Sequence, residues 1–389
     1  MNTQNTPVHI RLWNKDFWLL VVAEMFICTA VCTMLPTLPK WMLSKEMMTP
    51  EQTGLAMGVF GVGLYVMGGL CSWLVQRYRR NVVCMWAVVA LALDMAVLWY
   101  ADSMFDGVVE LWVILLLRLL LGVVFGLAIM VLTSTLIIDT CESAQRTEAN
   151  YSASWFSRFA LSIGPMVGLL VYDFFGFSGV LIGAIGCAVV ALILIKSVTF
   201  PFRAPEEGVH VFSLDRFFLP HGMVLFINLL FVSTVVGLLL SMPFEATFYA
   251  LMMAGFLLAL LAQRFVFRDA ELKSEVISGK ILLLAALLIL LTNYTSPVAP
   301  VLIGIGGGLI SSRFLLFFIK LSRHCQRGTS QSTYFLGWET GMALGLGLGY
   351  CLFSGQPSAL LYTAIAMTAI SLLMYHFFTH SWFVRNKNR

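Results

Sequence analysis

Charged side chains stand inside apolar segments of this chain, where an isolated charge is costly. Arg118 and Arg158 lie in two apolar segments that a short polar turn separates. An arginine in hydrocarbon is rare unless it has a partner or a function. Arg158 is followed by Gly164, Pro165 and Gly168, and small residues let neighbouring helices pack closely. This combination suggests a transport path through a membrane.

Two acids and two bases are expected to share one layer of the membrane. A helical rise of about 1.5 Å per residue places Glu24, Arg158, Arg313 and Glu339 about 10 Å from the same membrane face. Glu24 is the strongest candidate for a proton carrier, because a carboxyl in a cavity of low dielectric exchanges protons when a neighbouring charge moves. The simpler interpretation of Arg158 and Glu339 is a fixed bridge that closes one side of the path.

The remaining intramembrane polar residues are expected outside this layer. Asp94 and Arg118 are both expected about 10 Å from the opposite face, so an Asp94–Arg118 pair between consecutive spans is one prediction. The rival partner for Arg118 is Glu24, and Asp94, Glu24 and Glu339 are the three candidates for proton coupling. Asn228 either lines the cavity or bonds a neighbouring helix.

The composition identifies an all-α polytopic membrane protein. The chain has 389 residues, of which 59% are hydrophobic and 11% are charged, whereas soluble domains carry about 25% charged residues. About 20 apolar residues span a bilayer. Cutting the sequence at polar or turn-rich breaks gives twelve candidate transmembrane helices: 17–38, 52–75, 82–101, 111–138, 150–172, 178–198, 217–241, 245–266, 278–293, 298–320, 332–353 and 358–379.

The sequence argues against several other classes of protein. The eight cysteines form no CxxC pair and no metal-ligand spacing, so neither a metal nor another cofactor is expected. No nucleotide-binding loop, HExxH or GxSxG motif occurs, which disfavours an enzyme. The first apolar segment lacks a small-residue cleavage site, so no removable leader is expected. No nucleic-acid partner is expected either.

Basic residues indicate the orientation and the domain boundaries. Cytoplasmic loops are rich in Lys and Arg, which places both termini in the cytoplasm, with Lys280 in a cytoplasmic loop and only Lys40 and Lys45 outside. The break at 199–216 contains prolines and mixed charge. It indicates a cytoplasmic linker between two six-helix bundles, residues 1–198 and 217–389.

Internal repetition supports that division. The sequence LVQRY at 74–78 resembles LAQRF at 261–265, and QRT at 145–147 resembles QRG at 326–328. The second register places Gly164 and Gly168 opposite Gly345 and Gly349. Duplicated halves imply a pseudo-twofold axis along the membrane normal, with the substrate site between the halves.

Four motifs, in order along the chain, resemble those of the major facilitator superfamily. The family's loop between spans two and three resembles residues 72–81, although Gln76 replaces its acid. The family's arginine–glycine pattern in span four and its antiporter motif in span five are also similar to this chain. The matching residues are Gln76, Arg77, Arg79 and Arg80; Arg118, Gly122 and Gly126; Asp139 and Arg146; and Gly164, Pro165 and Gly168.

The resemblance implies two pseudo-symmetric six-helix bundles that work as a monomer by alternating access. It is closest in pattern to the drug- and metabolite-efflux branch, which implies proton-coupled export of a small organic solute from a bacterial cytoplasmic (inner) membrane. In this family a first-span acid is often coupled to the fourth-span arginine. Protons and membrane lipid are then the expected partners besides the solute.

Two alternatives stay open. The first is uptake or facilitated diffusion of a small anionic metabolite, with Arg118, Arg158 and Arg313 binding its carboxylate or phosphate. The second is transport of a lipid or another amphiphile in the same fold.

Overall fold

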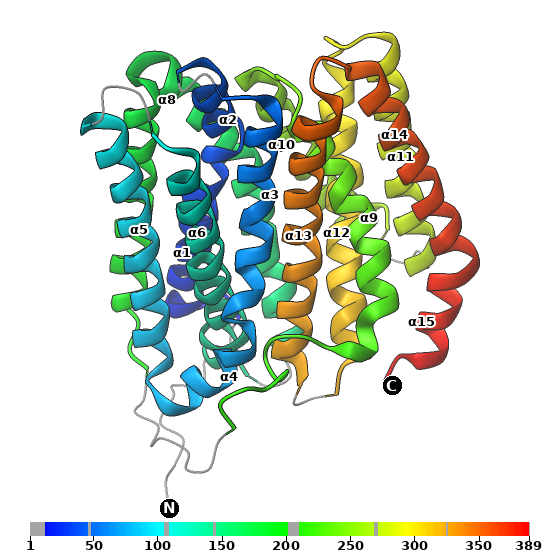
Figure 1. Cartoon of the computed structure of the whole chain (residues 1–389). Coiled ribbons are helices and arrows are strands. Elements are labelled where there is room, and N and C mark those ends of the chain that lie inside the picture. The colour runs from blue at the N-terminus through cyan, green and yellow to red at the C-terminus, as the bar shows by residue number, and fades with distance from the viewer. Residues whose placement is uncertain are drawn as a thin grey trace, which may run out of the picture.

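The computed structural model describes residues 12–45, 48–104, 109–142, 145–200, 210–267, 271–323 and 326–388. Helices make up most of this part of the chain, and no strand occurs in it (Figure 1). Of the expected linker 199–216, residues 201–209 lie outside the described residues. We refer to residues 12–200 as the N-terminal segment and to residues 210–388 as the C-terminal segment.

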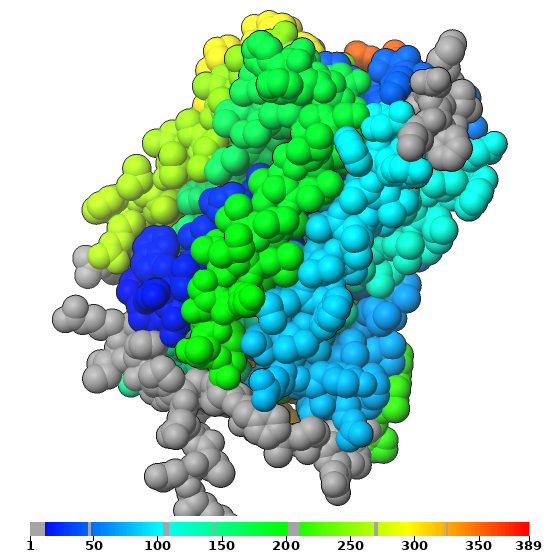
Figure 2. All heavy atoms as spheres, turned by 90° about the vertical axis from the view of Figure 1, so that its left-hand side faces the viewer, coloured from blue at the N-terminus to red at the C-terminus, as the bar shows by residue number. Residues whose placement is uncertain are grey.

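The N-terminal segment consists of helices joined by short connections. They are α1 (Lys15–Cys32), α2 (Met34–Ser44), α3 (Pro50–Val66), α4 (Gly68–Arg77), α5 (Arg80–Met104), α6 (Leu111–Val131), the π-helix η1 (Leu132–Leu136), α7 (Ile137–Asp139) and α8 (Arg146–Lys196). α1 begins at the lower end of the molecule in Figure 1, and α2 reaches the upper end. In Figure 2 the C-terminal part of α8 lies beside α5, with which it packs.

The C-terminal segment has a similar succession of helices. They are the 3-10 helix η3 (Pro220–Gly222), α9 (Met223–Leu240), α10 (Ala246–Phe265), α11 (Leu272–Thr292), α12 (Val298–Leu321), α13 (Arg327–Phe353), α14 (Pro357–Met374), the π-helix η5 (Tyr375–Thr379) and α15 (His380–Asn386). α15 ends at the lower end in Figure 1. We call this end, where α1 begins and α15 ends, the terminal end, and the opposite one the far end.

Local signals fix where the helices begin. Asn14 caps α1, because its side chain accepts a hydrogen bond from the backbone N–H of Phe17. Thr49 and Gln52 form a reciprocal capping box at the start of α3, with Pro50 in the first turn. The cap on α1 sets the depth of every side chain along that helix, including Glu24.

The prediction of an all-helical, multi-pass integral membrane protein is confirmed. Nine helical stretches in the described residues are long and apolar enough to cross a membrane, or ten if α3 and α4, bent by 44° to each other, form one span. α8 is 51 residues long, and its chain turns at Gly176 (φ 67°), a conformation that glycine adopts easily. Since α8 covers two predicted spans and the more polar α13 covers another, these helices are compatible with twelve spans, a number that stays a prediction.

The predicted start of the ninth span was wrong, and the error changes which charged residues are buried in the membrane domain. The ninth span was expected at 278–293, which left Lys280 near a loop. α11 instead begins at Leu272, so both Glu275 and Lys280 are buried within a helix. The first turns of α11 are polar in sequence, but α12 and α14 pack against this helix, and Gln263 of α10 donates a hydrogen bond to Glu275. A search for apolar residues therefore starts the helix too late.

Close glycine contacts join helices in both segments. A Cβ built on Gly164 of α8 would lie 2.5 Å from the Cβ of Cys32, where α1 meets α2. A Cβ built on Gly345 of α13 would lie 2.7 Å from the Cα of Gly237 on α9. Equivalent motifs thus pack against the first long helix of each segment. This matches the register that the sequence repeat predicts.

The glycines of span four show the same repetition. A Cβ on Gly122 of α6 would lie 3.1 Å from the Cα of Gly63 on α3, and Gly126 contacts Leu64 on the same helix. In the C-terminal segment, Gly304 of α12 would place a Cβ 2.9 Å from the Cα of Gly255 on α10. Small residues therefore allow close backbone approach at corresponding places in the two segments.

Candidate substrate chamber

A small cavity of about 60 Å³ lies between the two segments. α1, α2, α6, η1 and α8 line it from the N-terminal segment, and α13 lines it from the C-terminal segment. We call this cavity the chamber. Glu24, Arg158 and Glu339, three of the four charged residues expected in one layer, all line it.

Glu24 projects from α1 into the chamber and is only 2% exposed. The hydroxyl of Ser157 on α8 donates a hydrogen bond to its Oε1. Its Oε2 is buried and has no hydrogen-bond partner among the described residues. Arg118 is not its neighbour; Arg158 is the arginine that interacts with Glu24 electrostatically.

Glu339 enters the chamber from α13, on the opposite segment. Its side chain is partly exposed to the cavity. Within the described part of the chain, it accepts no hydrogen bond and forms no ion pair. Two carboxyl groups from different segments therefore face one small volume, and both have oxygen atoms without a partner.

Arg158 is held by neutral groups. Its Nε donates to the hydroxyl of Ser311 (2.6 Å), Nη1 to that of Ser154 (3.0 Å) and Nη2 to that of Tyr334 (3.4 Å). The guanidinium also lies over the ring of Trp155, 4.8 Å from its centroid. The structure does not form the fixed Arg158–Glu339 bridge that the sequence allows. Arg158 instead connects α8 to α12 and α13.

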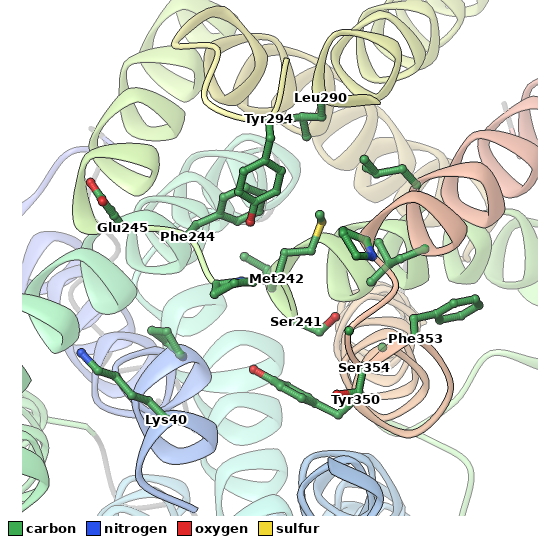
Figure 3. A pocket seen from close by; sticks show the side chains of 18 of the residues that line it. Lys40, Ser241, Met242, Phe244, Glu245, Leu290, Tyr294, Tyr350, Phe353 and Ser354 are labelled. Carbon is green, nitrogen blue, oxygen red and sulfur yellow. The ribbon is translucent and has the colours of Figure 1, made fainter. Parts of the chain in front are cut away.

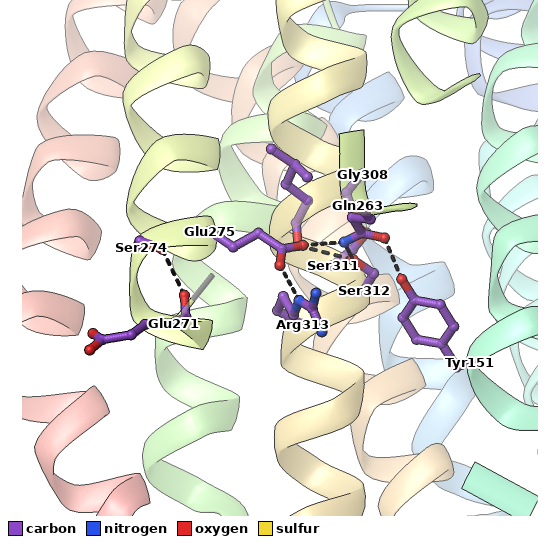
Figure 4. Close-up of polar contacts among 10 residues, drawn as sticks. Tyr151, Gln263, Glu271, Ser274, Glu275, Gly308, Ser311, Ser312 and Arg313 are labelled. Atoms are coloured by element: carbon purple, nitrogen blue, oxygen red, sulfur yellow. Dashed lines mark hydrogen bonds and ion pairs between the residues drawn. The ribbon is translucent and has the colours of Figure 1, made fainter. Parts of the chain in front are cut away.

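Arg313 does not reach the chamber, contrary to the sequence-based expectation. It pairs with Glu275 of α11 (Figure 4). The reason is helical geometry, because consecutive residues of α12 point about 100° apart. Ser311 faces Arg158, whereas Arg313 points towards α11. Depth alone, which the sequence supplies, does not give this direction.

A chain of side-chain hydrogen bonds crosses from the N-terminal to the C-terminal segment (Figure 4). The hydroxyl of Tyr151 on α8 donates to Oε1 of Gln263 on α10. The Gln263 amide donates in turn to Glu275 of α11 and to Ser312 of α12. We call these four residues the latch. The sequence signal for the latch was Gln263, a glutamine in the last turn of an apolar span. Glu275 could not be assigned to it from the sequence, because the predicted ninth span began at residue 278 and so excluded Glu275.

Arg118 and Asp94 form a separate site within the N-terminal segment. The two side chains interact electrostatically, but they make no direct ion pair among the described contacts. Arg118 donates to the backbone carbonyl of Ala56 on α3 (3.4 Å) and lies over the Phe60 ring, 4.9 Å from its centroid. Of the two partners considered for Arg118, the structure therefore places Asp94 beside it and not Glu24.

Asn228 bonds neighbouring helices and does not line the chamber. Its amide donates to the backbone carbonyl of Ser371 on α14 (3.1 Å), and its carbonyl accepts from the ammonium of Lys280 on α11 (2.6 Å). Lys280 also donates to the carbonyl and the hydroxyl of Ser371, at 2.9 and 2.6 Å. This fully buried lysine was missed by the sequence analysis because it was assigned to a loop.

The loop motif lies at the terminal end of the N-terminal segment. Arg80 forms an ion pair with Asp139, which joins the start of α5 to the end of α7. Arg77 and Arg79 are exposed, and Gln76 is partly exposed. The Nε of Arg146 has no partner among the described residues.

The described end of the linker packs against this region. The Phe217 ring occupies the space beside Gly68, where α3 and α4 bend. Burial and the nearby Arg80 lower the pKa of Arg216. The backbone N–H of Arg216 donates to the hydroxyl of Thr329 on α13 (2.8 Å). The linker is therefore attached to both segments at the terminal end.

A second, larger cavity of about 1230 Å³ opens at the far end (Figure 3). Phe244, Tyr294 and Tyr350 are among its lining residues, together with Glu245 and Lys40. We call it the vestibule. α2, α8 and α13 line both cavities, with adjacent α2 residues, 35 and 36, lining the chamber and the vestibule, respectively. A solute entering at the far end would therefore meet the chamber next.

Comparison with solved structures identifies the fold. The human organic anion transporter MFSD10 (TETRAN) is similar over 93% of this chain and 99% of that chain, with a TM-score of 0.66 and 15% identity. The nucleoside transporter NupG is similar over 93% and 98%, with a TM-score of 0.61 and 13% identity. The POT family transporter PepTSo is similar over 96% of this chain and 99% of that chain, with a TM-score of 0.69 and 11% identity.

The family follows from the sequence comparison. No curated protein sequence matches the chain. The family model for the Major Facilitator Superfamily matches residues 20–345. Together with the transporter folds above, this points to movement of a solute across a membrane and not to an enzyme. Because the match covers most of its length, the chain belongs to the Major Facilitator Superfamily.

Proposed function

We propose that this protein is a secondary active transporter that exports a small organic solute in exchange for protons. It acts as a monomer in a bacterial cytoplasmic (inner) membrane, with residues 1–198 and 217–389 as its two six-helix bundles and both termini in the cytoplasm. The observation that carries the proposal is Glu24, a buried carboxyl with one unpaired oxygen, in a chamber between the two segments. The antiporter-like motif at Gly164, Pro165 and Gly168 favours export.

Alternating access accounts for the arrangement of cavities and contacts. The latch and the Arg158 hydrogen bonds hold the segments together on the terminal side of the chamber. The vestibule opens on the other side. Rocking of one segment against the other would break the first set of contacts and open the chamber to the cytoplasm. Glu24 would then exchange its proton with a different compartment.

Glu24→Gln is expected to abolish solute-driven proton movement. Glutamine keeps the size and polarity of the side chain, but its amide cannot bind and release a proton as the carboxyl group does. Proteoliposomes that contain a pH-sensitive dye are challenged with a panel of organic solutes, and the initial proton flux is compared with that of wild type. We expect a loss of about 100-fold or more, the lower end of the range that removal of one proton-transfer group typically produces.

Glu148→Gln is the matched control for this experiment, because Glu148 is an exposed acid in the first turn of α8 and does not line the chamber. Its proton flux should equal that of wild type. Uphill solute transport with a normal pH dependence in Glu24→Gln would contradict the role of Glu24. The absence of proton flux in wild type with every solute would contradict proton coupling itself.

Tyr151→Phe is expected to open the terminal end. The variant leaves Oε1 of Gln263 without its donor from the other segment, and a buried polar group without a partner costs about 1–3 kcal/mol. The closed form should therefore lose about fivefold or more of its population relative to the open form. Spin labels at exposed positions 148 on α8 and 264 on α10, in a background without native cysteines, would report longer distances.

Tyr362→Phe provides the control for the latch, because Tyr362 on α14 is 61% exposed and lies outside the latch. It should leave the distance distribution unchanged. An unchanged distribution in Tyr151→Phe as well would show that the latch does not hold the terminal end closed.

A further inference from the structure

The intramembrane basic residues of the C-terminal segment are already engaged. Arg313 pairs with Glu275, and Lys280 donates to Asn228 and Ser371. Neither lines the chamber. Their positive charges are therefore not available to a solute bound between the segments.

The arginines of the N-terminal segment are engaged as well. Arg118 lies beside Asp94 and outside the chamber. Arg158 lines the chamber, but each of its three nitrogens donates to a hydroxyl, and the Trp155 ring covers one face of the guanidinium. An anion would have to displace these contacts before it could form a bidentate pair with Arg158.

The carboxyl groups of the chamber have the opposite character. Oε2 of Glu24 is buried without a hydrogen-bond donor, and Glu339 has no partner among the described residues. When both are ionised, they outnumber the single guanidinium of Arg158, so the lining carries a net negative charge. A buried unpaired carboxylate oxygen is costly, and a cation placed between the two groups would relieve that cost.

Aromatic rings complete this environment. Phe125 of α6 and Phe335 of α13 meet across the segments with ring centroids 5.7 Å apart, and Trp338 lines the same cavity one turn further along α13. The faces of aromatic rings attract organic cations, most strongly where water is excluded. Carboxylates and rings at one site therefore recognise an organic ammonium or phosphonium group that carries an apolar body.

We propose that the chamber binds an organic cation between Glu24 of α1 and Glu339 of α13. This inference rests on the proposed function, because it takes the chamber to be the transport site. The present volume of about 60 Å³ is below the roughly 300 Å³ of a typical ligand site. The cation therefore enters when the segments move apart, and binding to carboxylates on both draws them together again.

Protons and the cation compete for the same two carboxyl groups. The other titratable or charged groups that face them are Cys28 and Cys32 of α1, Arg158 of α8 and Tyr334 of α13. None of these supplies a third carboxylate. Cation affinity should therefore fall as the pH is lowered and protons occupy Glu24 and Glu339.

A matched pair of ions tests the sign of the charge. Tetraphenylphosphonium and tetraphenylborate have nearly the same size and shape but opposite charge. Binding of each radiolabelled ion to the purified wild-type protein in detergent is measured at about pH 9 and about pH 5.5, towards the alkaline and acidic ends of the range in which buried carboxyls titrate. We expect the phosphonium to bind more tightly than the borate, and its affinity to fall by about tenfold or more at the lower pH.

Variants of the two chamber carboxyl groups test whether the phosphonium binds in the chamber. Glu24→Gln and Glu339→Gln should each weaken phosphonium binding by about tenfold or more, whereas Glu148→Gln should not. Tighter binding of the borate, no binding of either ion, or unchanged phosphonium affinity in both chamber variants would overturn the proposal. This assay uses no proton gradient, so phosphonium binding without solute-driven proton flux would contradict the antiport and leave the cation site standing.

Discussion

Alanine in place of Gly164 or Gly345 is expected to lower the free energy of unfolding by about 3 kcal/mol, the upper part of the range for overpacked sites. The added methyl group at 345 would lie 2.6 Å from the backbone nitrogen of Leu238. At 164 it would lie 2.5 Å from the Cβ of Cys32 and 3.1 Å from the backbone nitrogen of Thr33. These neighbours belong to helix backbone or sit close to it, so whole helices would have to separate.

Gly183→Ala is the matched control within α8. A Cβ at Gly183 meets nothing within 4 Å, and alanine is the better helix former. This variant should be as stable as wild type or more stable by about 0.5–1 kcal/mol. Unfolding of the detergent-solubilised protein, followed by helical circular dichroism during a denaturant titration, gives all three values. Equal stability of Gly164→Ala, Gly345→Ala and Gly183→Ala would contradict the close packing.

Leucine in place of Asn228 is expected to destabilise the C-terminal segment by about 1.5–3 kcal/mol, the range for a hydrogen bond to a charged group. Asn228 supplies one of the three acceptors of the buried Lys280 ammonium, and leucine supplies none. The rings of Phe314 and Tyr375, 5.7 and 5.2 Å from Nζ, cannot replace that hydrogen bond.

Lys280→Met should cost much less than Asn228→Leu, although it removes the charged residue itself. Without the lysine, the Asn228 amide still donates to Ser371, and the hydroxyl of Ser371 is 3.4 Å from the Asn228 carbonyl. No buried polar group is then left without a partner. When an apolar side chain replaces a buried charged one and leaves no polar group unpaired, the free energy of unfolding often changes little.

The double variant Asn228→Leu/Lys280→Met completes a mutant cycle. It should be more stable than Asn228→Leu alone, because the unsatisfied ammonium is gone. Unfolding of the purified proteins in detergent measures the four free energies. Strictly additive effects would show that Lys280 does not depend on Asn228.

Most of the architecture could be predicted from the sequence because it depends on quantities that a sequence contains. Apolar length predicts helices that cross a membrane, and the positions of Gly164 and Gly345 in a repeat predict equivalent helix contacts. The depth of Glu24, Arg158 and Glu339 follows from helical rise. These three residues do meet in the chamber, although their roles there stay predictions.

The direction in which each buried charged side chain points, and the partner that it meets, could be learned only from the tertiary structure. Arg313 has the same predicted depth as Arg158, but α12 turns it towards Glu275 and away from the chamber. Lys280 resembles a loop residue because it lies near the polar start of α11, and only the tertiary structure, which brings Asn228 of α9 and Ser371 of α14 to its ammonium, makes it a buried group. Arg118 had two possible acids in the sequence, and the fold places Asp94 beside it.

The sequence by itself determined a helical membrane protein of the major facilitator type, with charges buried at defined depths. Spans, motifs and depth depend on composition and on one-dimensional spacing. The tertiary structure alone decided that Glu24 and Glu339 face one cavity, each with a carboxyl oxygen that has no hydrogen-bond partner among the described residues, while the Arg158 guanidinium in the same cavity is bonded to hydroxyl groups. The physical reason is that a side chain's partner depends on the rotation of its helix and on which helices pack against it, and neither is written in the local sequence.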